Sequence, residues 1–358
     1  MQAVILVGGE GTRLRPLTST LPKPIVDLVD RPFIAYMLEW LHGHGVDDVI
    51  MSCGFMATKL REVLGDGSAF GVSLTFVEEP EPRGTAGALK YAEDMLQDRF
   101  LMLNGDVLTD IDLTAQLAQH ERTGATGTLA LVPVEDPSAY GLVRLHEDQS
   151  VRGFLEKPKP EEIDTNLISA GAYVLERRVL DLIAPDRNVS IEREVWPVLV
   201  GHGLYGFVSD AYWLDIGTPA RYLQGSFDII SGRVRTSVKA GANGVHYDGT
   251  VVSPAVLGAG ARVDTGATVG SLAVLGPGVS VGAGSTVERA VVLGDSVIGA
   301  GCELRDCIVA PGCRIGDGSV VSEGAVLGEG VAIGADNVIT NGMRVFPGVQ
   351  LPDGAVKF

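Results

Sequence analysis

The chain has 358 residues, 46% of them hydrophobic and 20% charged, which excludes a mostly disordered polymer. Its formal net charge of −17 argues against a nucleic-acid partner, because phosphates would be repelled. An anionic ligand would need locally placed cations or a bridging metal ion. No apolar run approaches the roughly 20 residues of a membrane span, and the start lacks a secretion leader, so we expect a cytoplasmic protein without a membrane partner.

The cysteines and histidines do not suggest a metal centre or a nucleophilic site. Cys53, Cys302, Cys307 and Cys313 lack the paired CxxC spacing of zinc sites, so we expect reduced, structural thiols. The six histidines lie in no recognisable motif, and no Ser/His/Asp or Cys/His set stands out.

Up to about residue 235, apolar runs of strand length alternate with amphipathic stretches, the pattern of a parallel sheet covered by helices. The predicted strands are 4–8, 48–52, 74–77, 100–103 and 128–132, and the predicted helices are 33–41 and one ending near 93–97. Ligands of such sheets bind beyond the carboxyl ends of the strands, so residues that follow each strand are candidates for a site.

The second half of the chain is different. After a predicted helical connector at 221–235, Gly and Val dominate and branched aliphatic residues recur every six residues. They are Val251, Leu257, Val263, Val269, Leu275, Val281, Val287 and Leu293, then, after one-residue slips, Ile315, Val321, Leu327, Ile333, Ile339, Val345 and Leu351. This period predicts a parallel β-helix of hexapeptide repeats, with the aliphatic side chains pointing inward. We therefore divide the chain into domains 1–235 and 236–358.

The segment VILVGGEGTRLRP, residues 4–16, runs from an apolar strand into three glycines and two arginines. Glycine allows positive φ and lets a ligand approach the backbone N–H groups. The loop is therefore either a tight strand-to-helix turn or a phosphate-binding turn. Further along, Lys23 lies between Pro22 and Pro24, which restrict the backbone on both sides of it.

Taken together, this pattern closely resembles the signature of sugar-1-phosphate nucleotidylyltransferases. Later motifs agree in order: Glu79-Pro80, Gly84-Thr85-Ala86-Gly87, Asn104-Gly105-Asp106, Tyr140-Gly141, Glu156-Lys157-Pro158 and Trp213-Leu214-Asp215-Ile216-Gly217. The resemblance covers about the first 230 residues. It implies an α/β fold, with a Rossmann-like mixed or parallel sheet in a GT-A-like nucleotidyltransferase domain, followed by a left-handed parallel β-helix.

The reaction that this resemblance implies needs positioning and charge neutralisation more than covalent catalysis. A sugar phosphate oxygen attacks the α-phosphorus of a nucleoside triphosphate and expels pyrophosphate. The nucleophile is already an anion, so no general base is needed. By resemblance Asp106 and Asp215 bind Mg²⁺, which prefers carboxylate oxygens. A lone Asp after a strand is otherwise usually a turn or N-cap residue.

The same resemblance assigns the remaining site residues. Arg13 and Lys23 would clamp the β- and γ-phosphates, and Lys157 would lie near the sugar phosphate, so the predicted catalytic set is Arg13, Lys23, Asp106, Lys157 and Asp215. Arg15 fits a solvated or salt-bridged role equally well. The predicted nucleotide-binding residues are Leu6, Gly8, Gly9, Gly11, Thr12, Glu79, Gly84 and Thr85. The predicted sugar-binding residues are Gly141, Glu156, Asn166 and Gly171, with structural turn roles as the alternative for the asparagine and the two glycines.

The base and the sugar are predicted from fewer residues. Guanine presents N1–H and N2–H₂ donors, which a carboxylate such as Glu79 can accept, unless Glu78 and Glu79 are only a charged strand end. The segment 190–197 and Trp213 to Gly217 look most like mannose-1-phosphate guanylyltransferases that end in hexapeptide repeats. The stretch from Glu79 to Gly84 is two residues longer than the form associated with those enzymes. We predict GTP plus mannose 1-phosphate giving GDP-mannose, and the alternative is dTTP or UTP with glucose 1-phosphate.

Functions of other classes are also considered. Hexapeptide β-helices frequently host acyltransferases with a catalytic histidine, but His246 is the only histidine in this half and lies outside the repeats. A catalytically silent regulatory or scaffolding subunit is the third alternative, which retention of the five predicted catalytic residues argues against. We expect a homo-oligomer formed through the β-helix, because its faces and open end offer broad contact surfaces.

Overall fold

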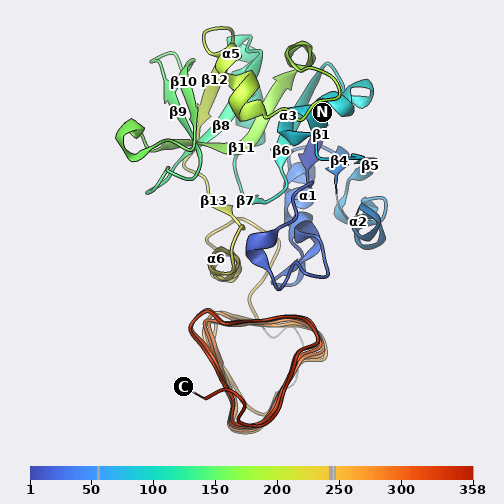
Figure 1. Ribbon diagram of the computed structural model, residues 1–358, viewed down its shortest axis with the longest axis vertical. Helices are drawn as coiled ribbons and strands as arrows, with labels where there is room; N and C mark the ends of the chain where they lie inside the picture. Colours follow the sequence, from blue (N-terminus) through green and yellow to red (C-terminus); the bar gives the residue numbers. More distant parts are fainter. Residues whose placement is uncertain (55–56, 242–244, 246, 358) are drawn as a thin grey trace. The chain divides into compact units, whose positions relative to one another are not determined.

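The computed structural model describes residues 1–54, 57–241, 245 and 247–357, and it forms two compact units (Figure 1). The first unit comprises Met1–Gly9 and Ile34–Trp213, and the second comprises Glu10–Phe33 and Leu214–Phe358. Each unit therefore combines segments that are distant in sequence. The predicted boundary between residues 235 and 236 stays a prediction. His246, considered above as a possible acyltransferase residue, lies outside the described residues.

A nine-stranded mixed sheet is the centre of the first unit, and the strand order along its main path is β10-β9-β11-β6-β1-β4-β5. Strand β8 pairs with β11 and β12 beside this path. The strands are β1 (Gln2–Leu6), β4 (Asp48–Cys53), β5 (Ser73–Glu78), β6 (Arg99–Asn104), β8 (Gly127–Pro133), β9 (Gly141–Leu145), β10 (Val151–Glu156), β11 (Leu167–Glu176) and β12 (Leu204–Val208). Strands β6, β1, β4 and β5 run parallel, whereas β11 runs antiparallel to β6, β8 and β9.

The five predicted strands are all present, and the mixed-sheet fold class is confirmed. The first one was predicted at 4–8 but is Gln2–Leu6, two residues earlier. Its ladder stops because the chain turns away at Gly8, although the Val7 N–H still donates to the Ser52 carbonyl oxygen at 2.9 Å. The apolar runs of β1, β4 and β6 were readable from sequence because these strands are mostly buried, whereas the edge strand β5 is only half-buried.

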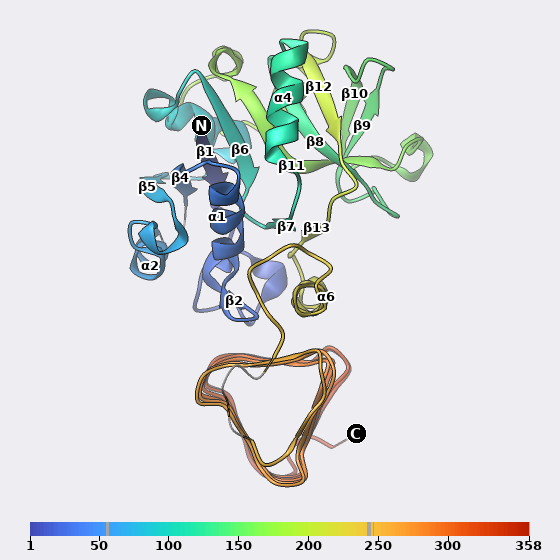
Figure 2. The same cartoon turned by 180° about the vertical axis from the view of Figure 1, so that it is seen from behind.

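Helices cover both faces of this sheet. They are α1 (Phe33–Gly43), α2 (Ala57–Leu64), α3 (Gly84–Tyr91), α4 (Leu113–Thr123) and α5 (Trp196–Leu199). Helix α4 lies on one face, in front of β8 in Figure 2, and α3 and α5 lie on the other, in front in Figure 1. Helix α1 confirms the prediction at 33–41. The helix predicted to end near 93–97 instead ends at Tyr91, and a 3-10 turn at Glu93–Met95 follows it.

The second unit contains helix α6 (Pro219–Ile230) and the short elements of residues 10–33. Helix α6 begins two residues before the predicted connector and ends at Ile230, and its Thr218 cap accepts a hydrogen bond from the Arg221 N–H. The Tyr222 hydroxyl of this helix donates to the Asp27 carbonyl oxygen. The short elements are the 3-10 turns η1 (Thr12–Leu14) and η2 (Lys23–Ile25) and the strands β2 (Asp27–Leu28) and β3 (Arg31–Pro32).

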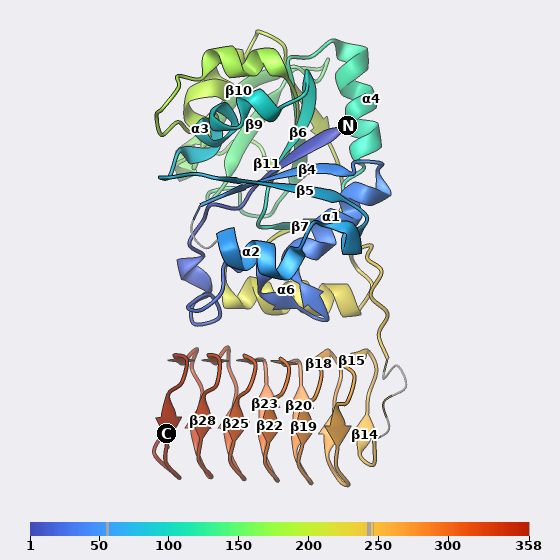
Figure 3. The same cartoon turned by 90° about the vertical axis from the view of Figure 1, so that its right-hand side faces the viewer.

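The rest of the second unit is a parallel β-helix with three six-stranded sheets, whose stacked coils are seen side-on in Figure 3. One sheet holds β14 (Thr250–Val251), β17 (Thr268–Val269), β20 (Thr286–Glu288), β23 (Glu303–Arg305), β26 (Val320–Val321) and β29 (Val338–Ile339). A second holds β15 (Ala255–Leu257), β18 (Ala273–Leu275), β21 (Val291–Val292), β24 (Ile308–Val309), β27 (Val326–Leu327) and β30 (Arg344–Val345). The third holds β16 (Arg262–Val263), β19 (Ser280–Val281), β22 (Val297–Ile298), β25 (Arg314–Ile315), β28 (Ala332–Ile333) and β31 (Gln350–Leu351).

The register of the β-helix explains the slips in the repeat. Paired residues are eighteen apart in the first coils, as Thr250 with Thr268, and seventeen apart in the middle, as Leu275 with Val292. Val292 therefore takes the inward position that the six-residue phase assigned to Leu293, which is the one wrong assignment of that series. At the two shortened corners Arg289 and Asp306 adopt left-handed backbone conformations, with φ of 49° and 45°.

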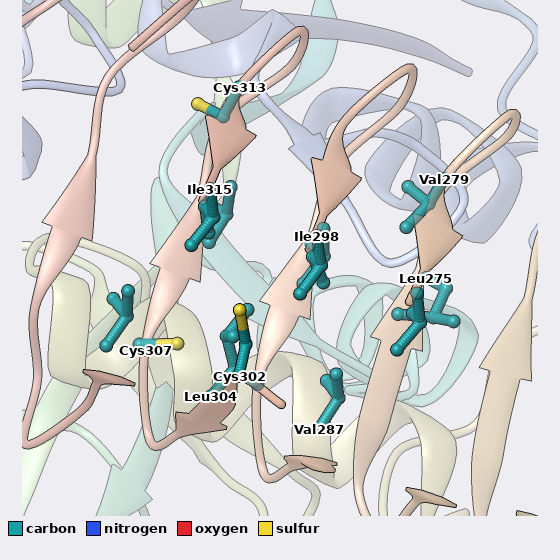
Figure 4. Packing of buried hydrophobic residues seen from close by; sticks show 14 of the residues in the cluster. Leu275, Val279, Val287, Ile298, Cys302, Leu304, Cys307, Cys313 and Ile315 are labelled. Atoms are coloured by element: carbon teal, nitrogen blue, oxygen red, sulfur yellow. The ribbon is translucent and has the colours of Figure 1, made fainter. Parts of the chain in front are cut away.

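The inward side chains form one continuous hydrophobic column, part of which is shown in Figure 4. Cys302, Cys307 and Cys313 are buried members of this column, and Cys53 is buried in β4. All four thiols are free, as predicted. Burial raises the pKa of Cys313 to about 11 and that of Cys53 to about 12, so these thiols stay protonated at neutral pH.

In the described parts of the chain, no helix combines the length and the hydrophobicity that crossing a membrane requires.

Candidate active site

The glycine-rich turn brings the two predicted phosphate-binding cations into one cluster of the second unit. Gly11 has φ of 62°, and a Cβ there would lie 3.1 Å from Lys23 Cβ and from Thr18 Cγ2. The Thr18 hydroxyl donates to the Gly11 carbonyl oxygen at 2.8 Å. Gly11 is thus the residue that lets the turn fold onto the segment of Lys23. Thr12 follows it as the exposed first residue of η1.

Arg13 and Lys23 both face the carboxylate of Asp215. The Lys23 Nζ lies 3.8 Å from Asp215 Oδ1, and the Arg13 Nη2 lies 3.9 Å from Asp215 Oδ2. The Lys23 side chain is only 9% exposed, whereas that of Arg13 is 68% exposed. The two cations therefore lie within electrostatic range of one carboxylate but beyond direct hydrogen-bond distance of it. Asp215 ends β13 (Trp213–Asp215).

Gly217 belongs to this cluster and was not assigned from sequence. A Cβ at this position would lie 2.8 Å from Arg13 Nη2 and 3.1 Å from both carboxylate oxygens of Asp215. Any side chain would displace the ion pair. The sequence does contain a signal for this residue, because Gly217 ends the motif Trp213-Leu214-Asp215-Ile216-Gly217, two residues after Asp215.

In the first unit, the ends of β1 and β6 bring Leu6 and Asp106 into one region. Leu6 ends β1, opposite Asn104 of β6. A Cβ on Gly105 would lie 2.8 Å from the Leu6 carbonyl oxygen and 2.5 Å from Val7 Cγ1, so only glycine fits there. Asp106 comes next, half-buried in the turn before β7 (Val107–Thr109). The chain can thus turn tightly at the strand end and present the carboxylate there.

Gly8 and Gly9 are exposed and leave their backbone accessible. A Cβ on Gly54 would lie 3.3 Å from the Gly8 carbonyl oxygen, so the two glycines come into close contact. A Cβ on Gly9 would meet nothing within 4 Å. The close approach constrains Gly54, whereas a Cβ on Gly8 would lie at an ordinary contact distance of 3.7 Å from the Gly54 nitrogen. Nothing around Gly9 requires a glycine, and its bare backbone suits a ligand.

Glu79 is fixed in place by two hydrogen bonds. The Ser52 hydroxyl donates to its Oε1 at 2.8 Å, and the Arg83 backbone N–H donates to its Oε2 at 3.2 Å. Both carboxylate oxygens are thus engaged just after β5, at the start of α3. A carboxylate has about four acceptor positions, so each oxygen keeps a further one. Glu79 directly follows the end of β5, as the alternative of a charged strand end expects, but its carboxylate is also fixed by the two hydrogen bonds.

Gly84 and Thr85 attach the start of α3 to the segment 186–192. Gly84 has φ of 70°, and a Cβ there would lie 2.6 Å from the Val189 carbonyl oxygen. The Thr85 hydroxyl donates to Glu192 Oε2 at 2.8 Å and accepts from the Ile191 N–H at 2.8 Å. The predicted nucleotide-binding pair is therefore part of a rigid junction.

The predicted sugar-binding residues Gly141 and Glu156 are directly paired in β9 and β10. A Cβ on Gly141 would lie 2.5 Å from the Phe154 ring and 3.2 Å from Glu156 Oε2, so the glycine makes room for the carboxylate. Burial, with the nearby negative charge of Glu192, raises the pKa of Glu156. Lys157 is exposed and has left-handed φ of 53°, and its N–H donates to the Tyr140 carbonyl oxygen at 3.0 Å.

Gly171 and Asn166 differ in their surroundings. Gly171 has φ of 75°, and a Cβ there would lie 2.9 Å from the Asn104 side-chain amide, which places it at the irregularity between β11 and β8. Asn166 is exposed, and its carbonyl oxygen accepts from the Val134 N–H at 3.0 Å. Gly171 is thus close to Asn104, in the motif that contains Asp106, whereas the backbone of Asn166 binds Val134 in the loop before β11.

Two further residues of the first unit, Glu192 and Tyr173, were not assigned from sequence. Glu192 lies in the π-helical turn Ile191–Val195 and also accepts from the Ser190 hydroxyl at 2.7 Å. Tyr173 is buried in β11, and burial together with the charges of Glu192, Glu156 and Asp106 raises its pKa. All three carboxylates therefore act on this tyrosine electrostatically, while its hydroxyl hydrogen-bonds with that of Ser169 at 3.0 Å. In the sequence, segment 190–197 carries only a resemblance to mannose-1-phosphate guanylyltransferases, and nothing in it distinguishes Glu192 from its neighbours.

Asp106 and Asp215 fit a divalent cation by chemistry. Carboxylate oxygens are the hard donors that Mg²⁺ prefers, and it keeps several waters of its own. Across the described ranges, no group of three or more His, Cys, Asp or Glu side chains forms a metal site. Asp106 belongs to the first unit and Asp215 to the second, so each is described here with its own neighbours.

Comparison with known proteins identifies the family of the chain. Residues 2–232 match the family model described as nucleotidyl transferase, and residues 251–355 match the GMPPB C-terminal domain. A mannose-1-phosphate guanylyltransferase of Mycobacterium tuberculosis is 40% identical over 74% of this chain and 74% of its own length. A mannose-1-phosphate guanyltransferase of Saccharomyces cerevisiae is 37% identical over 70% of this chain and 71% of its own.

A solved structure is also similar to much of this chain. HddC from Yersinia pseudotuberculosis, crystallised in complex with GMP-PN, superposes with a TM-score of 0.55 at 28% identity, over 64% of this chain and 99% of that one. Together with the family models and the curated relatives, this likeness shows that the chain belongs to the nucleotidyl transferase family, with mannose-1-phosphate guanylyltransferases among its relatives.

Proposed function

We propose that this protein is a mannose-1-phosphate guanylyltransferase, which converts GTP and mannose 1-phosphate into GDP-mannose and pyrophosphate. The observation that carries the proposal is the cluster of Arg13, Lys23 and Asp215, formed by the family's signature segments in a chain 40% identical to such an enzyme. Two cations beside one carboxylate are suited to a triphosphate and are unexplained by the requirements of the fold alone.

In the proposed mechanism, an oxygen of the mannose phosphate attacks the α-phosphorus of GTP. The bond from this phosphorus to the bridging oxygen breaks, and pyrophosphate leaves with the electron pair. The attacking oxygen is already anionic, so no residue needs to remove a proton from it. Lys23 and Arg13 bind the β- and γ-phosphates and stabilise the charge that develops on the leaving group. The N–H groups of Gly9 and Gly11 add donors.

A divalent cation, which we propose to be Mg²⁺, would be held by Asp106 and Asp215. When bound, it neutralises phosphate charge. Asp215 has a second task, because its carboxylate lies between Lys23 and Arg13 and orients both. The predicted roles of Lys157 at the sugar phosphate and of Glu156 at the sugar hydroxyls complete the catalytic set. The raised pKa of Glu156 fits a carboxyl that is shielded from water.

We propose that Glu79 recognises the guanine base by accepting hydrogen bonds from it. Its two oxygens are oriented by Ser52 and Arg83, and each retains capacity to accept from the guanine N1–H and N2–H₂. Pre-orientation lowers the entropy lost when the base binds. The guanine nucleotide in the complex of the related HddC protein supports the same choice.

The proposal is tested by a substrate panel. Pyrophosphate release is measured with GTP, dTTP, UTP, ATP and CTP, each with mannose 1-phosphate and with glucose 1-phosphate, in the presence of Mg²⁺. We expect GTP with mannose 1-phosphate to give the highest kcat/KM. A clear preference for dTTP or UTP would overturn the assignment of the base, and no pyrophosphate release with any pair would overturn the enzyme.

We also propose that the protein is a cytoplasmic homo-oligomer associated through its β-helix, with neither nucleic acid nor membrane as a partner. Two of the three β-helix sheets carry outward side chains that are mostly exposed or half-buried and so are available for contact. The net charge of −17 disfavours anionic polymers. Light scattering at micromolar concentration measures the mass, and a monomer would contradict the proposed association.

A further inference from the structure

The three faces of the β-helix differ in how their outward side chains are covered. On the sheet formed by β15, β18, β21, β24, β27 and β30, the first five outward residues are apolar and at most 6% exposed: Val256, Val274, Val291, Ile308 and Val326. The outward residues of the sheet that ends with β31 include Arg262, Val297, Arg314 and Gln350, all exposed. The first sheet, named here the covered face, is thus buried within the protein and is not an open docking surface.

Arg344 breaks the apolar row of the covered face. It occupies the sixth outward position, in β30, paired with Val326 of β27. Its Nη1 donates to the carbonyl oxygens of Arg13 and Arg15, at 3.2 and 2.9 Å. Nearby, the Thr20 hydroxyl donates to Glu329 Oε2 at 2.8 Å. Both contacts join the last coils of the β-helix to residues 10–33, which belong to the same compact unit.

The two acceptors of Arg344 are the carbonyl groups at the end of the 3-10 turn η1. Carbonyl groups at the end of a helical turn lack partners within it, and a cationic side chain placed there can donate to them. Because Arg344 binds the backbone of Arg13, it leaves the Arg13 side chain to face Asp215. The contact therefore fixes the turn without competing for its guanidinium group.

We propose that Arg344 is a positioning residue for nucleotide binding: it holds the turn that presents Arg13 to the triphosphate, so the last coils of the β-helix tune phosphate affinity. The inference rests on the proposed function. It gives the β-helix a task within its own chain besides association. The apolar row of the covered face is buried, and Arg344 adds directional bonds to the turn that would bind the phosphates.

The first test measures the turn itself and does not depend on activity. Trypsin can cut after Arg13, whereas the bond between Arg15 and Pro16 resists it. Mass spectrometry follows the release of residues 1–13 from the full-length protein. We expect Arg344→Ala to raise the initial rate of this cleavage about threefold or more, because charge-assisted bonds to two carbonyls are lost. The matched control Arg314→Ala removes the same charge from an exposed position on another face and leaves the rate unchanged.

The second test separates nucleotide binding from sugar binding. With mannose 1-phosphate saturating, Arg344→Ala raises KM for GTP about three- to tenfold, the scale of a partly exposed charged contact. KM for mannose 1-phosphate stays within about twofold. Arg314→Ala changes neither value. Circular dichroism confirms that both variants are folded at the assay temperature.

The outcomes distinguish this inference from the proposed function. Equal cleavage rates in Arg344→Ala and Arg314→Ala overturn the positioning role, even if the wild-type enzyme makes GDP-mannose. Equal increases of KM for both substrates overturn it as well. Wild-type protein without any pyrophosphate release overturns the proposed function, and the proteolysis test then still decides whether Arg344 holds the turn.

Discussion

The predicted phosphate-binding residues of the second unit differ from the predicted nucleotide-binding residues Glu79 and Thr85 in how their side chains interact with their neighbours. Arg13, Lys23 and Asp215 face one another at 3.8 to 3.9 Å, as charges without direct hydrogen bonds among them. Glu79 and Thr85 instead make hydrogen bonds of 2.8 Å to neighbouring groups. The first group acts through charge at a distance, and the second through fixed directions.

This difference predicts two kinds of mutational effect. Charges that stabilise a developing anion act on the rate of the reaction. Oriented hydrogen-bond acceptors act on which substrate is chosen, because a mismatched partner leaves a buried polar group unsatisfied. Substitutions of the two groups should therefore differ in both the size and the nature of their effects.

The largest effect is expected at Asp106. Asp106→Ala should lower kcat for pyrophosphate release at least about a hundredfold, because a cation ligand and the associated electrostatic stabilisation are lost. Asp112→Ala is the control, since it makes the same chemical change at the N-cap of α4, where the side chain accepts from the Ala115 N–H and lies 3.9 Å from His44 Nδ1. Activity of Asp106→Ala within about tenfold of wild type would contradict the assignment of Asp106 as a cation ligand.

Lys23 and Arg13 allow a buried and an exposed cation of the phosphate-binding group to be compared. Lys23 is 9% exposed and Arg13 68%, so solvent screens the arginine more. We expect Lys23→Ala to lower kcat/KM for GTP about a hundredfold and Arg13→Ala about tenfold. Steady-state kinetics with both variants measures the ratio. A larger loss of kcat/KM for Arg13→Ala would mean that the burial of a cation does not determine how much it contributes to the reaction.

Glu79 tests whether the second group selects the base. Glu79→Gln should lower kcat/KM for GTP about tenfold, since an amide replaces one acceptor with a donor, while the values for UTP and dTTP do not fall. Glu78→Gln, at the neighbouring exposed position, is the matched control. A uniform loss with all nucleotides would show that Glu79 only stabilises its loop, through Ser52 and the Arg83 backbone.

The smallest effect concerns stability. His120 is buried, where its imidazole hydrogen-bonds with the Thr128 hydroxyl and Glu176, and burial lowers its pKa. The unfolded chain, with the ordinary pKa near 6.5, binds the proton more readily. The stability that the neutral ring contributes is thus fully present above about pH 6.5 and is lost as pH falls from that value through the lower pKa of the folded protein.

Urea unfolding at pH 7.5 and 5.5 measures this effect. All three tryptophans lie in the first unit, so their fluorescence reports on the domain that contains His120. The urea midpoint should fall at the lower pH, and His120→Gln should reduce the difference between the two values. An equal pH dependence in the variant would assign it to other groups.

Much of the fold was readable from sequence because its signals are local. A buried parallel strand such as β1 is a short apolar run, and each β-helix coil repeats the same inward aliphatic, so no distant contact is needed to recognise either. The antiparallel strands β9 to β11 were not predicted, because their burial depends on neighbours that the local pattern does not show. The misplaced Leu293 has a similar cause: the six-residue period does not say which corner is one residue shorter.

The site separates in the same way. The sequence by itself determined the motifs and the residue types predicted to bind phosphate, a cation and a sugar, because strand ends, glycines and prolines constrain the chain locally. Only the tertiary structure decided that Arg13 and Lys23 share Asp215, that Glu192 joins Thr85, and that Arg344 supports the turn of Arg13. These are contacts between residues far apart along the chain, and a Coulomb interaction or a hydrogen bond depends on distance in space, which no local pattern records.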